Sequence, residues 1–116
     1  MFVHRAVLLN RFHLMLPLTL LTMCSLIFSM SAQANLRLGN EAFQQKDFTT
    51  ALIHYQSSAH MGETFAQLQL ASLYANGLGI EKDPTTSVIY ISLAEDHGNE
   101  EAKNMLSSFT EAEQAQ

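Results

Sequence analysis

The chain of 116 residues contains a single cysteine, Cys24, which lies in its first third. With one cysteine, no disulfide within the chain can support the fold. The folded part must therefore rest on a packed apolar core. No stretch shows clear alternation of apolar and polar residues with a period of two, so no sheet is expected.

Positive charge is also scarce, with six Lys and Arg against eleven Asp and Glu. Residues 35–116 keep four of these cations and all eleven acids, which gives this part a net charge of −7. An acidic surface repels the phosphates of nucleic acids and of anionic lipids. The partner is therefore expected to be neutral or basic, and not a nucleic acid.

The N-terminal third has the order of charges and apolar residues that is typical of a secretory signal peptide. Arg5 and Arg11 precede the apolar stretch 14–30, and the small residues Ala32 and Ala34 form an Ala-x-Ala pattern after it. A basic start, an apolar segment and small residues at the exit favour export and cleavage. We expect residues 1–34 to be removed after Ala34, leaving a periplasmic or secreted chain of residues 35–116 with no membrane contact.

Two alternatives remain for this segment. An uncleaved membrane anchor through 14–30 is one, although a span needs roughly 20 apolar residues and this stretch is shorter and contains Pro17. A lipoprotein acylated at Cys24 is the other. Leu21-Thr22-Met23-Cys24 resembles a lipobox only loosely, because Met23 stands where a small residue is expected.

Apolar residues recur at helical spacing after residue 34, which predicts helices near 35–45, 48–60, 64–76, 84–97 and 100–112. Asp47 and Asp83 are expected N-caps, and Gly62 and Gly98 are expected left-handed residues at helix ends. The stripes contain the following residues, all expected in the core: Phe48, Ala51, Leu52, Tyr55, Ala59, Ala66, Leu70, Leu73, Tyr74, Tyr90, Leu93, Ala94, Ala102, Met105, Leu106 and Phe109.

Several pairs of identical residues share one offset, which indicates an internal repeat. The offset is 36 residues, and it relates the expected caps and glycines as well as apolar positions. The pairs are Asn40 and Asn76, Lys46 and Lys82, Asp47 and Asp83, Thr49 and Thr85, Thr50 and Thr86, Ile53 and Ile89, Gly62 and Gly98, Ala66 and Ala102, and Leu70 and Leu106.

The second unit of this repeat reads Ala66-x3-Leu70-Ala71-x2-Tyr74-x2-Gly77-x-Gly79-Ile80-x2-Asp83 and continues to Tyr90, Ala94, Gly98 and Ala102. This pattern resembles the Sel-1-like repeat family, a relative of the tetratricopeptide repeat. The resemblance implies an all-α fold, a short right-handed superhelix (solenoid) of antiparallel helix pairs, preceded here by the signal helix. It implies a degenerate unit at 35–62, a full unit at 63–98 and a terminal helix at 99–112.

The chain departs from the family pattern at a few positions. Ala71 replaces a glycine, Tyr90 stands where tryptophan is common, and Glu95 replaces an alanine. In the first unit, Glu41 and Phe43 lie where the two turn glycines would be. The turn of that unit is therefore expected to be built differently and more tightly.

No pattern of catalytic or metal-binding residues emerges from the rest of the chain. His54 and His60 are six residues apart and face different ways on a helix, and a zinc site needs three or four convergent ligands. His54, His60 and His97 are expected to face solvent, with His60 and His97 favoured at helix C-termini. The paired acids around Gly98 are expected to be solvated, and no enzyme activity, cofactor or metal is expected.

A second stripe on the helix 64–76 is the candidate surface for a partner. It consists of Phe65, Gln69, Ser72 and Asn76. The resemblance implies that the first helix of each pair lines the concave face, where such scaffolds usually bind proteins or peptides. The expected function is an exported, non-catalytic interaction module. The alternatives are a self-associating subunit of an envelope complex, a homo-oligomer, and a truncated relative of a longer repeat protein.

Overall fold

The structure is a computed structural model that describes the backbone of residues 2–115 and the side chains of residues 18–111, 114 and 115. Its described residues form five helices and no strand, which confirms the all-α prediction. The helices are α1 (Phe2–Gln44), α2 (Phe48–His60), α3 (Thr64–Asn76), α4 (Pro84–Asp96) and α5 (Glu100–Gln114).

The bounds of α2 to α5 lie within about two residues of those predicted, but α1 begins far earlier than residue 35. The reason lies in the local sequence. Between Leu18 and Leu38 there is no proline or glycine, and these are the residues that end or break a helix. The helix therefore runs without a break through the predicted cleavage site after Ala34.

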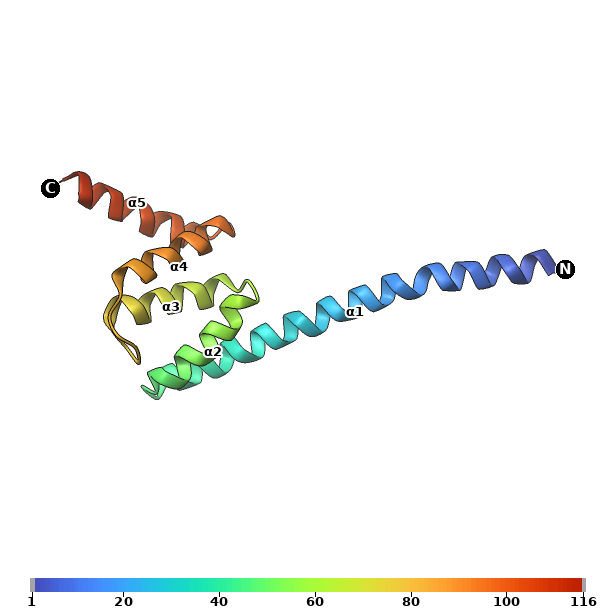
Figure 1. Cartoon of the computed structure of the whole chain (residues 1–116), viewed down its shortest axis with the longest axis horizontal. Coiled ribbons are helices and arrows are strands. Elements are labelled where there is room, and N and C mark those ends of the chain that lie inside the picture. The colour runs from blue at the N-terminus through green and yellow to red at the C-terminus, as the bar shows by residue number, and fades with distance from the viewer. Residues whose placement is uncertain (1, 116) are drawn as a thin grey trace. The chain divides into compact units, whose positions relative to one another are not determined.

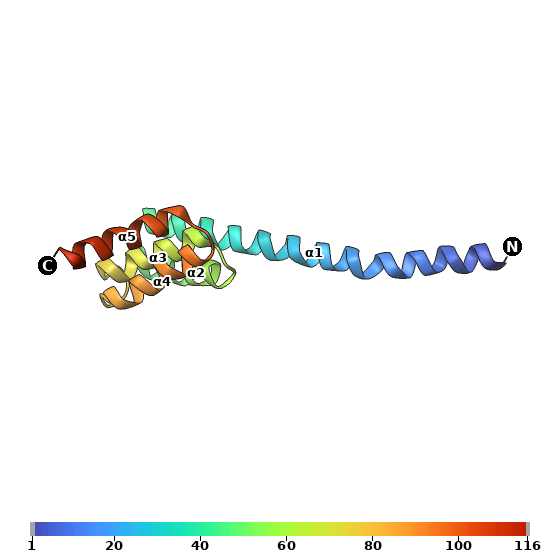
Figure 2. The same cartoon turned by 90° about the horizontal axis from the view of Figure 1, so that it is seen from above.

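The chain divides into two compact units, one up to Met30 and one from Ser31 onward. The first is helical, and its large apolar side chains from Leu18 to Met30 are exposed. In the second, the end of α1 and the helices α2 to α5 follow one another in alternating directions, and α3 packs against both α2 and α4 (Figures 1 and 2). The predicted sites lie in this second unit.

Each of the first four helices is followed within two residues by a residue with a positive φ angle: Lys46, Gly62, Gly77 and Gly98. At Gly98 the backbone N–H groups of the glycine and of Asn99 donate to Glu95 O and Ala94 O, at 2.7 and 3.0 Å. This pair of bonds is a Schellman cap. The left-handed glycines predicted at 62 and 98 are thereby confirmed.

The two turns between paired helices are built differently, as predicted for the first unit. The first turn spans only residues 45–47, with Lys46 at φ 61° and Asp47 N–H donating to Ala42 O. The second spans 77–83 and has two left-handed glycines. Gly79 lies so close to Phe48 that a Cβ there would be 2.6 Å from the Phe48 carbonyl carbon.

Asp47 and Asp83 cap the helices that follow them, as predicted. The Asp47 carboxylate accepts from the Thr50 N–H at 3.1 Å. Asp83 accepts from the Thr85 and Thr86 N–H groups and from the Thr86 hydroxyl, the last at 2.6 Å. These bonds from Thr50 and Thr86 hold the pKa of both carboxyl groups below its usual value.

The second unit has two apolar clusters, one on each side of α3. Ala66, Leu70 and Leu73 of α3 pack with the end of α1 and with α2 around the buried Tyr55. Leu68 and Ala71 of α3 pack with Ile91 and Ala94 of α4 and Ala102 of α5. Neither Leu68 nor Ala71 was on a predicted stripe, because a helix covered on two sides has no single apolar face.

Two residues predicted in the core are exposed, so those predictions are wrong. Phe109 is 52% exposed and Leu93 38% exposed. Leu73, which precedes Phe109 by 36 residues, is fully buried beside α2. Leu78 and Ile80 of the 77–83 turn help to cover the first cluster, which contains Leu73. No such turn follows Phe109, because α5 continues to Gln114.

Candidate interaction surface on helix α3

Helix α3 exposes one narrow strip between the two helices that cover it. Its buried residues are Ala66, Gln67, Leu68, Leu70, Ala71 and Leu73. Phe65, 41% exposed, and Asn76 are its exposed side chains, and Gln69 and Ser72 are half-buried on the same stripe. The four residues selected from the sequence are therefore on the solvent-accessible side of α3, and their role in binding stays a prediction.

The C-terminal half of this strip is held by hydrogen bonds within the helix. The Asn76 amide donates to the Ser72 carbonyl at 2.9 Å and lies 3.4 Å from the Ser72 hydroxyl. Phe65 stands near the other end, in the first turn of α3. The strip thus presents an exposed aromatic ring at one end and an ordered pair of polar side chains at the other, a combination suited to a peptide or protein partner.

Two further apolar side chains are exposed at positions that the sequence analysis did not select as surface. Ile53 on α2 and Ile89 on α4 are each 60% exposed and are related by the 36-residue offset. The sequence did contain a signal, because neither residue was on a predicted core stripe.

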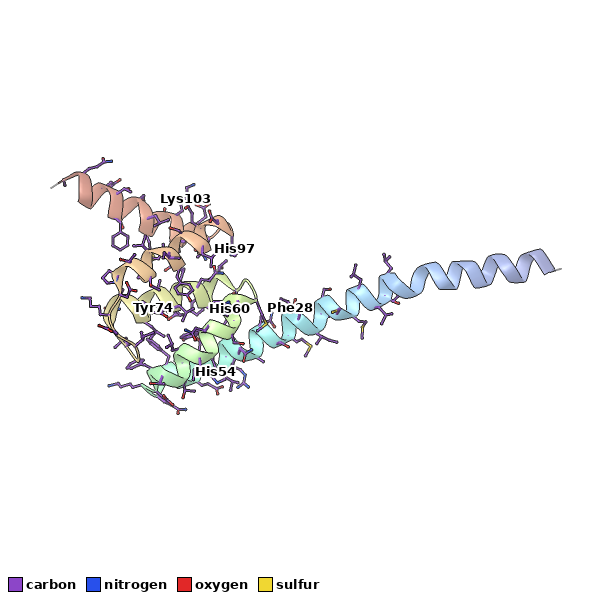
Figure 3. All side chains as sticks on the ribbon, viewed as in Figure 1. Phe28, His54, His60, Tyr74, His97 and Lys103 are labelled. Carbon is purple, nitrogen blue, oxygen red and sulfur yellow. The ribbon has the colours of Figure 1, made fainter. Side chains whose placement is uncertain are left out.

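The three histidines of the second unit lie at separate points (Figure 3). His60 and His97 are exposed, as predicted, whereas His54 is half-buried. His97 differs from a purely solvent-facing residue, since its Nδ1 lies 3.3 Å from the side-chain amide of the fully buried Gln67. Among the side chains that the structure describes, no group of three His, Cys, Asp or Glu residues comes together.

Gln67 links three elements of the second unit. Its amide donates to Ala59 O of α2 at 3.3 Å, and this bond leaves its Oε1 facing His97 Nδ1 at 3.3 Å. The neighbouring Asn99 amide donates to the Thr64 hydroxyl at 3.2 Å. These contacts join the turn before α3 to the turn after α4. The side chains of Gln67, His97 and Asn99 therefore help to pack these helices against one another.

A shallow hollow of about 390 Å³ lies beside the 77–83 turn and is lined by Tyr74, Ile80, Glu81, Lys82 and Asp83. The Tyr74 ring stacks on Tyr90, with the centroids 5.8 Å apart. Burial, and then the neighbouring Tyr74, raise the pKa of Tyr90. The Asp83 carboxylate already caps α4, so this hollow does not hold a pair of free carboxylates for acid–base chemistry.

Comparison with protein-family models, with curated proteins and with solved structures found no match to this chain.

Proposed function

We propose that the folded unit is an exported, non-catalytic interaction module of the Sel-1-like type, which binds a protein or peptide along α3. The observation that carries this proposal is the accessible strip of α3. A helix enclosed by α2 and α4 still exposes Phe65, together with a row of hydrogen-bonding side chains. Aromatic side chains, phenylalanine among them, are enriched in protein interfaces.

Several equivalent positions of the repeat take the same local roles, which supports the Sel-1-like assignment. Asp47 and Asp83 each cap a helix of 13 residues. Ala66 and Ala102 are each fully buried. The 77–83 turn, with its two left-handed glycines against Phe48, accounts for the spacing of the family pattern in this chain.

The charge of the folded unit restricts the chemistry of the partner. Arg37, Lys46, Lys82 and Lys103 are its cations, against eleven acids. Exposed acids attract basic groups over about one Debye length, ~8 Å at physiological salt. The partner is a neutral or basic protein segment that places an apolar side chain against Phe65, with no enzymatic step, metal or cofactor involved.

Affinity capture from an envelope extract tests this proposal with a matched pair of variants. Phe65→Ala removes the exposed ring of α3, whereas Ile89→Ala removes a more exposed apolar side chain from α4. The proposal predicts that Phe65→Ala weakens partner capture about 10-fold or more, as expected for an interface anchor, and that Ile89→Ala leaves it unchanged. Equal capture by both variants would remove the proposed surface.

Self-association is a second candidate, and the exposed Phe109 is the observation that favours it. A second copy could cover this ring. Against it, α5 carries Asn104 and Ser107 where α3 carries the buried Leu68 and Ala71. The outer face of α5 is therefore polar and ends the stack, as a capping helix does. Light scattering decides, because a strict monomer at high concentration excludes this candidate.

Export is the part of the proposal that concerns the first unit. Among the described residues there is one helix long and apolar enough to cross a membrane, with its span at Leu18–Gln44, near the N-terminus. This segment is compatible with a signal peptide and with a membrane anchor. The predicted cut after Ala34 would release a periplasmic or secreted module.

A further inference from the structure

The border of the folded unit does not coincide with the predicted cleavage site. The second compact unit begins at Ser31, whereas the cut was predicted after Ala34. Ala32, the first alanine of the Ala-x-Ala pattern, is only 7% exposed, while Ala34 is exposed. One of the two small residues that a peptidase would recognise is thus part of the packed unit.

Ala32 also supplies a hydrogen-bond acceptor to the core. The hydroxyl of Ser58 is fully buried on α2 and donates to the Ala32 carbonyl at 2.8 Å. Next to it, the Asn35 amide donates to the Ser57 hydroxyl at 3.1 Å. A cut after Ala34 would remove this acceptor and turn Asn35 into a charged N-terminus, and a buried hydroxyl that loses its acceptor destabilises a fold.

The helix itself protects the site. Residues 31–34 lie in the interior of α1, and the chain has no proline or glycine between Leu18 and Leu38 that would end the helix before the cut. A peptidase that reads an extended chain would have to unwind α1 and release Ala32 from α2. A signal peptide that is cleaved has no need for such packing.

The segment before Ser31 has the properties of a membrane span. Its described large apolar residues are exposed, and they occur on all sides of the helix: Leu18, Leu20, Leu21, Met23, Leu26, Ile27, Phe28 and Met30. Side chains of this segment, with Phe28 labelled, project from the ribbon in Figure 3. A helix that is apolar all round is buried in protein or in lipid. Arg5 and Arg11 precede it, which favours a cytoplasmic N-terminus.

We infer that the Ala32-x-Ala34 segment is a structural part of the folded unit and not a processing site, so that the chain keeps its N-terminal helix as a membrane anchor. The stretch 14–30 is at the short end of the range for a span, about 17–25 residues. Local thinning of the bilayer accommodates a short span. The folded unit is then exported across the membrane and stays attached to it.

Two substitutions in the full chain, expressed in a bacterial host with a C-terminal tag, separate the two roles of the motif. Ala32→Leu and Ala34→Leu each place a large side chain where a signal peptidase requires a small one. The inference predicts that the wild-type chain and both variants each have the intact mass of their own uncleaved sequence. It further predicts that Ala32→Leu lowers the thermal unfolding midpoint of the chain in detergent, because Ala32 is buried, and that Ala34→Leu leaves it unchanged.

Cleavage would overturn the inference. If the wild-type chain begins at Asn35 and both substitutions block that cut, the motif is a processing site. A chain that begins at Cys24 with an added lipid overturns the retained span as well.

Membrane fractionation tests the inference independently, even if the Ala32→Leu chain does not fold. The wild-type and Ala34→Leu chains are expected in the membrane pellet after an alkaline carbonate wash, and their release contradicts the inference. Capture through Phe65 is a separate result that does not depend on this one.

Discussion

At the scale of single residues, the left-handed backbone conformation of Lys46 locally destabilises the folded chain. It is the only described non-glycine residue with a positive φ, 61°, and it closes the Schellman cap of α1. For a residue with a Cβ, this conformation costs about 1–2 kcal/mol. Glycine adopts it freely but loses more conformational entropy on folding. We expect Lys46→Gly to stabilise the chain by about 0.5–1 kcal/mol in urea unfolding. A loss of stability would contradict this explanation of the turn.

Gly79 and Gly98 form a matched pair that separates backbone conformation from steric contact. Both have positive φ, but a Cβ on Gly98 meets nothing within 4 Å, whereas one on Gly79 would lie 2.6 Å from the Phe48 carbonyl carbon. Each change to alanine has the left-handed cost of about 1–2 kcal/mol. We expect Gly79→Ala to lose clearly more than Gly98→Ala, because it also pushes the 77–83 turn away from α2. Equal losses by urea unfolding would show that this contact is unimportant.

At the scale of helices, the Asp83 cap of α4 has a testable dependence on pH. Its bonds to Thr86 and Thr85 hold its pKa below the usual 3.8. A carboxyl group with a lowered folded pKa stabilises the fold above its unfolded pKa and loses this contribution as the pH falls through the folded pKa. Asp83→Asn keeps an acceptor oxygen but does not titrate.

The wild-type chain is therefore expected to unfold a few degrees above Asp83→Asn at pH 7. This difference should shrink below about pH 4 and vanish as Asp83 is protonated. Thermal unfolding followed by circular dichroism at a series of pH values gives the comparison, and Glu81→Gln, at an exposed position just before the cap, serves as the control. A difference that persists at pH 2 would show that the charge of Asp83 does not support α4.

The helices were predictable where their ends depend on neighbouring residues. Asp47, Asp83, Gly62 and Gly98 act within a few positions of themselves, so the sequence placed α2 to α4 correctly. The start of α1 was not predictable in this way, because a cleavage motif and a helix interior use the same small residues. Phe109 was also misplaced, since its burial depends on what covers α5 and not on the stripe that it occupies.

At the scale of the whole molecule, the candidate surface could be predicted as a stripe but not as the accessible side of a helix enclosed by two others. The sequence identified Phe65, Gln69, Ser72 and Asn76 by spacing alone. That α3 is covered on both sides follows from its packing against the helices that precede and follow it, α2 and α4. The exposure of Ile53 and Ile89 was not predicted, although neither residue lies on a predicted core stripe.

The most direct test of the central claim is site-specific photo-crosslinking of the full chain in living cells. A photoreactive amino acid replaces Phe65 on α3 or, as the matched control, Ile89 on α4, both of which are exposed. The account predicts a discrete cross-linked product from position 65, of larger mass than the chain and distinct from its dimer, and none from position 89. A product from position 89 alone, or the same products from both positions, would contradict the proposal that this chain binds its partner through α3.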